Sequence, residues 1–454
     1  RGSLLEEGIV QRYPCVVVTR GVRRRNERLA RLRAIVRPEL AIVAVDLASA
    51  SQAAVVCDHD SVVLARRMFA GSAWAIDAIL DWAQPIARAA GFAGVVVACE
   101  PTGHRWKPLL ERARARDVGL VCVQPLLVHR GREGEDFTRE RSDYHDAAII
   151  GRLAGELRCY VPYALQGEWA RLRHLGARRN GQLVVATGAR QALRDLLECA
   201  WPGVLAVAAK PLESLTWRAA MRVSTDPAVI AALGYETFAA RVGEQLRTLG
   251  GRRRNHRIMR AVFAAAQAPD GLACERRAAC ERAAFVLGDW ERALAELAIV
   301  EARMICTLDA LALRELCQSI DGLSAVGAAA ILAETGDPDR FGGPRSWPKH
   351  AGICPRANES GTYRGQTKAS GRGRPALRTA VWRAIWGLLP HNAVYAARYE
   401  HLTTRTRNQL TDGQARAALG AALLRQLFVV VTRRVPWDPV IAAGRKEVQL
   451  PQAA

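Results

Sequence analysis

The N-terminal third of the chain alternates short apolar runs with longer amphipathic segments. β-branched runs bounded by turn residues predict strands at residues 41–48, 53–57, 62–69, 94–99 and 119–123. The apolar spacing between and after them predicts helices at residues 72–90 (disturbed at Pro85), 103–116 and 142–157. The first three strands can form an antiparallel meander, and the later alternation of helix and strand implies parallel additions. We therefore expect an α/β domain built on a mixed sheet, as in ribonuclease-H-like folds.

From about residue 165 the pattern becomes helical. Long Ala/Leu/Arg/Glu segments predict amphipathic helices, as a coiled coil or a helical insertion, at residues 167–200, 226–266 and 275–315. A third region begins near Leu316, contains a Gly/Arg/Ser-rich stretch up to about residue 375, and predicts helices at 376–390 and 413–431. Residues 1–37 contain an Arg-rich run, which we interpret as a solvated tail.

Composition narrows the class of protein. The net charge of +21 favours a polyanionic partner, and phosphate backbones are the usual one. The 11 cysteines are dispersed without a C-x-x-C pair, which predicts reduced, buried thiols and argues against zinc. No apolar stretch is long enough to cross a bilayer and no signal peptide is visible, so we expect a cytoplasmic protein without a membrane partner.

Four carboxylates stand at element ends. Asp46 ends the first strand, Glu100 ends a later one, and Asp143 and Asp146 lie three apart on one predicted helix, so they share a face. Singly, each is more typical of a turn or a helix cap. Together they would repel one another unless hard divalent cations neutralise them, so we predict two Mg²⁺ (or Mn²⁺) ions and phosphodiester chemistry. His145 lies between the two aspartates but points off their face.

The C-terminal region holds a second constellation. Small residues around Gly322 and Gly327 lie between two helical runs, which predicts a helix-hairpin-helix element whose amides bind a phosphate, or else a tightly packed αα turn. Further on, two Ser-Gly pairs, at Ser360 and Ser370, stand in a stretch rich in Arg and Lys. A serine in such a loop is normally an ordinary loop residue.

Three motifs carry a resemblance to a known family: Val45-Asp-Leu-Ala, Cys99-Glu-Pro-Thr-Gly-His and Ser142-Asp-Tyr-His-Asp-Ala. They resemble the Asp, Glu, Asp, Asp motifs of the DEDD transposases of the insertion-sequence family numbered one-ten, whose N-terminal domain is similar to RuvC-type junction resolvases. The resemblance implies metal-ligand roles for Asp46, Glu100, Asp143 and Asp146.

The same resemblance extends to the C-terminal region. It implies that Ser360 is the nucleophile and that Ser370 belongs to a second Gly-containing turn, where Gly371-Arg-Gly-Arg departs from the family's usual Gly-Asn. Expected contacts to nucleic acid are Gly322, Gly327, Arg364, Lys368, Arg372 and Arg374. We accordingly divide the chain into a basic extension (1–38), a RuvC-like DEDD catalytic domain (39–162), a helical or coiled-coil linker (163–315), a mainly α C-terminal transposase domain (316–440) and a tail (441–454).

The predicted function is that of a site-specific transposase that excises and inserts a mobile DNA element. The resemblance implies a transient covalent Ser360–phosphate link and a homo-oligomer (dimer or tetramer) in which one subunit's serine domain completes another's acidic site. It also implies a guide RNA, which no residue proves. The rivals are a structure-selective junction resolvase that uses water as nucleophile and a non-catalytic nucleic-acid-binding protein. A retroviral-integrase-type transposase fits less well, because its last acid would be a Glu rather than part of an Asp-x-x-Asp pair.

Overall fold

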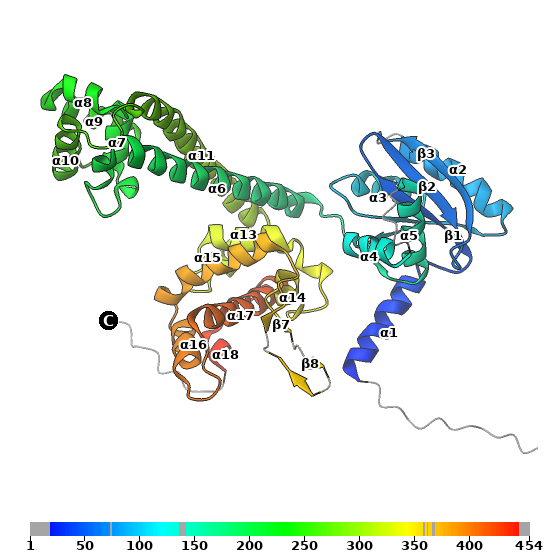
Figure 1. The fold of residues 1–454 in the computed structure, drawn as a ribbon. Coiled ribbons are helices and arrows are strands. Elements are labelled where there is room, and N and C mark those ends of the chain that lie inside the picture. The colour runs from blue at the N-terminus through cyan, green and yellow to red at the C-terminus, as the bar shows by residue number, and fades with distance from the viewer. Residues whose placement is uncertain are drawn as a thin grey trace, which may run out of the picture. The chain divides into compact units, whose positions relative to one another are not determined.

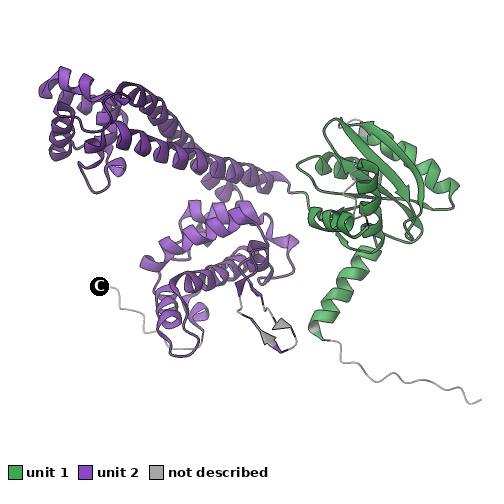
Figure 2. Cartoon of the chain, viewed as in Figure 1, with its two compact units in different colours: residues 1–164 green, residues 165–454 purple. Residues whose placement is uncertain are grey.

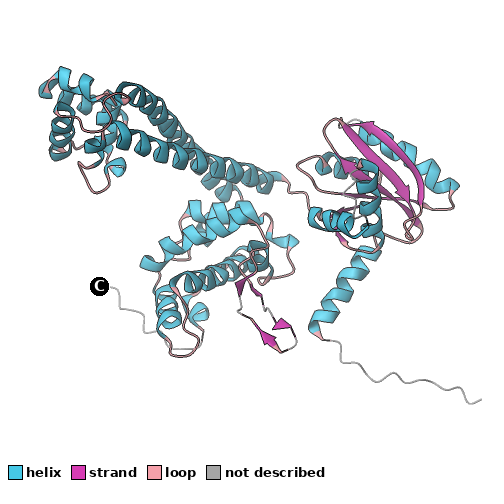
Figure 3. Cartoon of the chain, viewed as in Figure 1, coloured by secondary structure: helices cyan, strands magenta, loops and turns pink. Residues whose placement is uncertain are grey.

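The computed structural model describes residues 19–72, 75–135, 142–356, 359–360, 362–365 and 368–444 of the 454-residue chain. The chain divides into two compact units, residues 1–164 and 165–454 (Figure 2). Unit 1 is the α/β part, and unit 2 is almost entirely helical (Figure 3). This confirms the expected fold class. The finer division into five segments stays a prediction.

A six-stranded mixed sheet forms the centre of unit 1, in the order β3-β2-β1-β4-β5-β6. The strands are β1 (Leu40–Leu47), β2 (Ser51–Cys57), β3 (Val63–Ala70), β4 (Gly94–Cys99), β5 (Leu120–Val123) and β6 (Cys159–Tyr160). The first three pair antiparallel, β4 and β5 are added in parallel, and β6 closes the edge antiparallel. The meander and the parallel additions were predicted, whereas the two-residue strand β6 was not.

Helices cover both faces of the sheet because side chains alternate along each strand. Val43 and Val45 of β1 join the core under α2 (Ala75–Ala89) and α3 (Trp106–Ala115). Ile42 and Ala44 join the opposite core under α1 (Arg20–Arg33), α4 (Pro125–Glu135) and α5 (Asp143–Gly155). β1 is therefore buried on both faces, as expected of a central strand.

Three helices of unit 1 depart from the sequence prediction. The Arg-rich run assigned to a solvated tail forms α1, which Thr19 caps by accepting from the Val22 amide. The physical reason is the apolar spacing of Leu29, Leu32 and Val36, which pack onto the sheet while the arginines face solvent. Helix α4 was not predicted at all, and α2 runs on through Pro85. Residues 1–18 of the expected extension lie outside the described part.

Two long helices form an arm in unit 2. α6 (Gly167–Ala200) and α11 (Arg276–Ala310) lie side by side and antiparallel (Figure 1). Ion pairs of Arg178 with Glu296 and of Arg179 with Glu301 flank their apolar seam. The predicted helices at 167–200 and 275–315 are thus confirmed.

A cluster of shorter helices caps the far end of this arm (Figure 1). It contains η1 (Pro202–Leu205), η2 (Pro211–Glu213), α7 (Leu215–Val223), α8 (Pro227–Leu233), α9 (Tyr235–Thr248) and α10 (His256–Gln267). The segment expected to be helical at 226–266 is confirmed as helical, but it divides into α8, α9 and α10. It is broken where Gly234 takes a positive φ of 70° and where Asn255 caps α10.

The C-terminal part of unit 2 packs around α17 (Asp412–Arg433). Around it lie α12 (Arg314–Gln318), α13 (Ala325–Thr335), η3 (Pro338–Arg340), α14 (Ser346–Ala351), α15 (Pro375–His391), α16 (Ala393–Thr404) and α18 (Pro439–Ala443). By length and composition α17 could cross a membrane, but most of it is buried in this core. The helices expected at 376–390 and 413–431 are confirmed as α15 and α17.

No disulfide links the cysteines within the described ranges, which leave out Cys15. Six of those ten cysteines are buried, but Cys274 and Cys306 are exposed. The expectation of buried thiols was therefore wrong at these two positions. Cys274 lies just before α11, and Cys306 lies on its exposed side.

Candidate functional site

Strand register brings the first two acids together. β1 and β4 are parallel neighbours, and Val45 of β1 pairs with Cys99 of β4. Asp46 and Glu100 are therefore the next residues on adjacent strands, at the same edge. Both follow residues that face the α2–α3 core, so alternation turns them toward the α5 face. Glu100 also accepts a 3.1 Å hydrogen bond from the Thr102 hydroxyl.

Helix α5 supplies the other two acids from its first turn. Asp143 begins the helix and Asp146 lies three residues on, with Asp146 buried and Asp143 exposed. The helix can lie close to β1 and β2 because it has Gly151 at the crossing: a Cβ there would be 2.6 Å from the Cys57 sulfur. The first turn is thereby held over the strand end that carries Asp46.

An arginine that the sequence reading missed pairs with this acidic group. Arg132 of α4 donates from Nε to one oxygen of Asp146 and from Nη2 to the other at 2.6 Å. The bidentate contact is favourable because both partners are charged and planar. The Asp146 side chain is 13% exposed and that of Arg132 is 28% exposed, so the pair is partly shielded from water.

The acids interact electrostatically. The pKa of Asp46 is raised to about 6, first by burial and then by the negative charges of Asp146, Glu100 and Asp143, whereas the charge of Arg132 opposes the rise. Among the residues that the structure describes, Arg132 is the one arginine paired with these four carboxylates, so this described group carries an excess of negative charge in a chain with a net charge of +21. That excess is unfavourable without a cation.

The donor set suits a hard divalent cation, since it consists of carboxylate oxygens alone. In this conformation, however, no three Asp, Glu, His or Cys side chains among the described residues are grouped closely enough to hold one ion. Arg132 engages both oxygens of Asp146, so this carboxylate would have to leave the arginine to bind a metal. The acids thus fit a metal in charge and chemistry, with Arg132 as the competing cation.

Ser360 lies at the end of a narrow β-hairpin in unit 2. β7 (Pro355–Arg356) pairs with β10 (Lys368–Ala369), and β8 (Glu359–Ser360) pairs with β9 (Tyr363–Arg364). Ser360 pairs with Tyr363, next to the turn. Figure 1 shows this hairpin extending away from the helices around α14 and α17. The side chains of Ser360 and Arg364 lie outside the described part, and so do residues 357, 358, 361, 366 and 367.

The base of the hairpin is tightly packed. The Ser370 hydroxyl donates to the Gly352 carbonyl oxygen at 3.2 Å, and the Gly371 amide donates to the same oxygen at 3.0 Å. Gly352 has a φ of 73°, and a Cβ at Gly373 would lie 2.5 Å from the Gly352 nitrogen. Ser370 therefore secures a turn at the hairpin base, and the choice of Ser360 as the nucleophile stays a prediction.

A buried carboxylate anchors this base to the arm. Glu334 of α13, only 4% exposed in its side chain, accepts from Arg173 of α6 at 2.6 Å and from Arg374 at 2.9 Å. Asn180 also donates to it at 3.4 Å. Two cations around one buried acid make a stable arrangement only if all three stay together. The guanidinium of Arg374 is thus engaged within the protein, and its expected contact with nucleic acid stays a prediction.

The other expected nucleic-acid contacts lie at separate places in unit 2. Lys368 and Arg372 are exposed near the hairpin base. Gly322 has a φ of 82°, and a Cβ there would lie 3.0 Å from the Gly387 carbonyl oxygen of α15, so close helix packing alone requires a glycine. The Gly327 amide already donates to the Ser324 hydroxyl that caps α13. The helix-hairpin-helix interpretation therefore stays a prediction.

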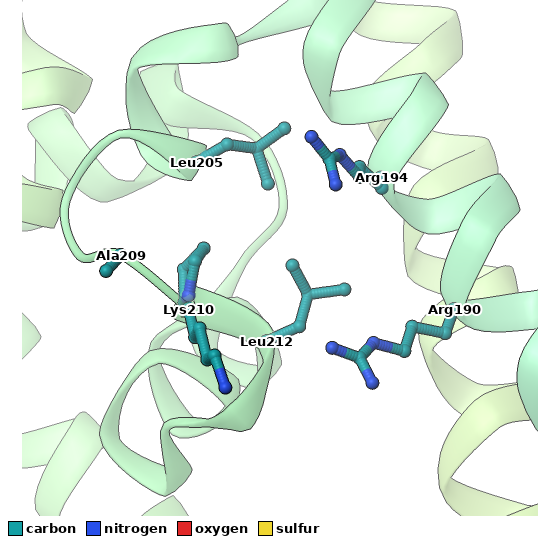
Figure 4. A pocket seen from close by; sticks show the side chains of 7 residues that line it. Arg190, Arg194, Leu205, Ala209, Lys210 and Leu212 are labelled. Carbon is teal, nitrogen blue, oxygen red and sulfur yellow. The ribbon is translucent and has the colours of Figure 1, made fainter. Parts of the chain in front are cut away.

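The far end of the arm carries a basic pocket of about 180 Å³. Arg190 and Arg194 project from α6 toward Leu205 and Leu212, with Lys210 beside them (Figure 4). Glu213 lies 3.5 Å from Arg190 and 3.6 Å from Lys210, and Glu198 lies 4.0 Å from Arg194, so two acids offset part of the charge of the three cations. The pocket is a positively charged hollow suited to an anion.

Arg132 and Glu334 are the two site-forming residues that sequence reasoning missed. Neither lies in a motif: Arg132 is one of many arginines, and Glu334 stands in an apolar helix where only its polarity marks it. A charged residue in such a helix requires a buried partner, and this was the available signal at Glu334. No comparable signal marks Arg132.

Comparison with known families adds an independent observation. Residues 43–202 match the DEDD transposase model of the IS110 group, described as "Transposase". Residues 314–400 match a model described as "Transposase IS116/IS110/IS902 family". The two matches together span more than half of the chain and include the four acids and Ser360. No protein with a curated description matches the chain.

Proposed function

The chain belongs to the IS110 family of DEDD transposases and is therefore a DNA transposase, and we propose that it breaks and rejoins DNA with a divided active site. In this proposal the acids Asp46, Glu100, Asp143 and Asp146 form one half and Ser360 forms the other. The two halves lie in different compact units of the chain.

The observation that carries the proposal is the acidic cluster of unit 1. The negative charges of Asp146, Glu100 and Asp143 lie near enough to Asp46 to contribute to its raised pKa. Such a cluster disfavours DNA by itself, because phosphates are also negative. It becomes useful for phosphodiester chemistry once divalent cations turn the same place positive.

We propose that the four acids hold two Mg²⁺ (or Mn²⁺) ions. When bound, the metal would stabilise the negative charge that develops on the phosphate. The protein's own contribution is the rigid placement of the ligands, with Asp46 and Glu100 on neighbouring strand ends and the two aspartates on one helix turn.

The serine step balances without a further reactant. The Ser360 hydroxyl gives up its proton, its oxygen forms a bond to the phosphorus, and the bond from phosphorus to one deoxyribose oxygen breaks, that oxygen taking a proton. Rejoining is the reverse with a different deoxyribose hydroxyl, which releases Ser360. The energy of the broken phosphodiester is kept in the phosphoserine.

Two finer parts of the proposal concern partners. An oligomer would let the acids of one subunit act with the serine of another, which the division between units 1 and 2 allows. A guide RNA would account for the excess of cations, including the pocket around Arg190 and Lys210. Sequencing the nucleic acid that co-purifies with the protein tests the second: a defined RNA supports it, and its absence contradicts it.

Ser360→Ala, with Ser370→Ala as its matched control, tests the mechanism. The protein is incubated with its element and flanking DNA in Mg²⁺, and covalent protein–DNA adducts are separated under denaturing conditions. We expect Ser360→Ala to abolish adduct and rejoined product and Ser370→Ala to retain both. Cleavage at the full rate by Ser360→Ala would instead identify water as the nucleophile, as in a junction resolvase. Activity unaffected by chelation would contradict the acidic metal site.

A further inference from the structure

Two exposed tryptophans stand out on α15. Of the tryptophans that the structure describes, only Trp382 (39% exposed) and Trp386 (54% exposed) lie open to solvent. Their ring centroids are 6.4 Å apart, at an interplanar angle of 73°. Exposed aromatic rings of this size are common at binding surfaces and contribute little to the fold of a free molecule.

Trp382 forms one wall of a groove of about 290 Å³. The floor is apolar and comes from α15, α17 and the segment before the hairpin: Ile353, Val381, Ala417 and Gly420. The charged lining residues are Arg378 and Arg416, both cations. The groove therefore offers a flat aromatic surface next to the guanidinium of Arg378, whereas Arg416 is ion-paired with Asp412 and its side chain is only 12% exposed.

Internal contacts hold the two arginines in place. Arg378 donates to the Ala351 carbonyl oxygen at 3.0 Å. Arg416 donates to Asp412 at 2.7 Å and lies 3.8 Å from the ring centroid of Trp386. Trp386 thus has a cation on its ring and helps to position Arg416, whereas Trp382 is the ring that lines the groove.

Charge complementarity decides between possible occupants. A second copy of this chain would bring a net charge of +21 toward a groove whose charged lining is cationic. DNA brings negative phosphates, and an unpaired base brings a π-face that stacks on tryptophan. The groove also adjoins the serine hairpin, because Ile353 precedes β7 by two residues.

We propose that this groove binds one unpaired base of the DNA strand that is cut, stacked on Trp382, with the flanking phosphate on Arg378. The proposal rests on the transposase function argued above and names a contact that positions its substrate. Trp382 is the base platform, and Trp386 positions Arg416 rather than touching the base. A base held there keeps the strand at the foot of the hairpin that carries Ser360.

Binding of a fluorescent single-stranded DNA to the full chain, measured in EDTA, tests the proposal without any catalysis. Trp382→Ala should weaken binding about 5- to 150-fold, the range for loss of one stacked base, while Trp382→Phe keeps most of the affinity. Binding of a blunt duplex should stay unchanged, because its bases are paired. Phe285→Ala, at an exposed aromatic of α11 outside the groove, is the matched control and should bind like the parent protein.

Each of the other possible results contradicts one specific part of the proposal. Unchanged binding by Trp382→Ala, or an equal loss in Phe285→Ala, removes the base platform but leaves the transposase mechanism standing. An effect confined to single-stranded RNA removes the DNA assignment. A loss of oligomer in Trp382→Ala, seen by analytical ultracentrifugation, makes the groove a subunit interface. Failure of the parent protein to bind any DNA contradicts the proposed function itself.

Discussion

Replacing Arg132 by methionine removes a charge from the acidic cluster and keeps most of the side-chain volume. Asp146 is buried and loses its bidentate partner, so its carboxylate is left with three other acids nearby. Breaking a buried pair costs about 3–5 kcal/mol, whereas exposed pairs contribute about 1 kcal/mol or less. Because the Arg132 side chain is 28% exposed, we expect an intermediate loss of about 2–3 kcal/mol from unit 1.

The loss should be smaller when a divalent cation is present. In the parent protein a metal has to displace Arg132 from Asp146, whereas in Arg132→Met that carboxylate is free to bind it. Added Mg²⁺ should therefore stabilise the variant more than the parent protein. In EDTA the expected loss corresponds to a decrease of roughly 4–12 °C in the melting temperature of unit 1.

Differential scanning calorimetry of the full chain, in EDTA and in Mg²⁺, measures both effects. Hydrogen–deuterium exchange of peptides from α4 and α5 locates the change. Arg116→Met is the matched control, because Arg116 pairs with Asp77 and Asp81 at the surface of the same unit. An equal loss in Arg116→Met, or a loss in Arg132→Met that Mg²⁺ does not reduce, would refute the role of Arg132 as the cluster's counter-ion.

Three further predictions concern unit 2. Ser370→Ala loses one hydrogen bond to the Gly352 carbonyl oxygen, so its free energy of unfolding in chemical denaturation should fall by about 1 kcal/mol. Its strand-transfer activity should be retained. Glu334→Gln leaves two arginines without their acid and should lower the free energy of unfolding of unit 2 by about 3–5 kcal/mol. Glu296→Gln, at a more exposed ion pair, is the control and should lower it by about 1 kcal/mol or less. Equal losses in the two variants would contradict the anchoring role of Glu334. Burial and the charge of Arg340 lower the pKa of His350 to about 4, so folding favours its neutral form. The contribution of His350 to stability is therefore complete above about pH 6.5 and is lost as the pH falls toward 4. His350→Gln should therefore flatten the decline in stability of unit 2 between pH 7 and pH 4.5 by about 1–3 kcal/mol, and an unchanged decline would contradict this cause.

The sequence allowed the sheet and the acidic site to be predicted because both depend on local patterns. Strand β1 alternates apolar residues up to Asp46, and the parallel position of β4 followed from the helix between them. The order of the acids at element ends then placed them at one edge. Each of these inferences needs only the periodicity of a few residues and the rules of sheet connection.

The parts that could not be predicted depend on contacts distant in sequence. Helix α1 was interpreted as a tail because its arginines outnumber the three apolar residues that dock it onto the sheet. The pairing of Glu334 with Arg173 joins residues 161 positions apart. Arg132 is one arginine among many, and only the fold brings it to Asp146. The amino-acid composition alone does not indicate which cation pairs with which acid.

The paired helices α6 and α11 fix the distance between the two ends of the arm. A helix of 34 residues extends about 50 Å at 1.5 Å per residue. Base pairs follow one another every 3.4 Å, so this distance corresponds to about 15 base pairs, or one and a half turns of a duplex. At the far end, the loop between α9 and α10 exposes Arg252, Arg253 and Arg254. A duplex lying along the arm would meet those arginines at a spacing fixed by the helices, so inserting or deleting turns in both would change which phosphates the protein reaches.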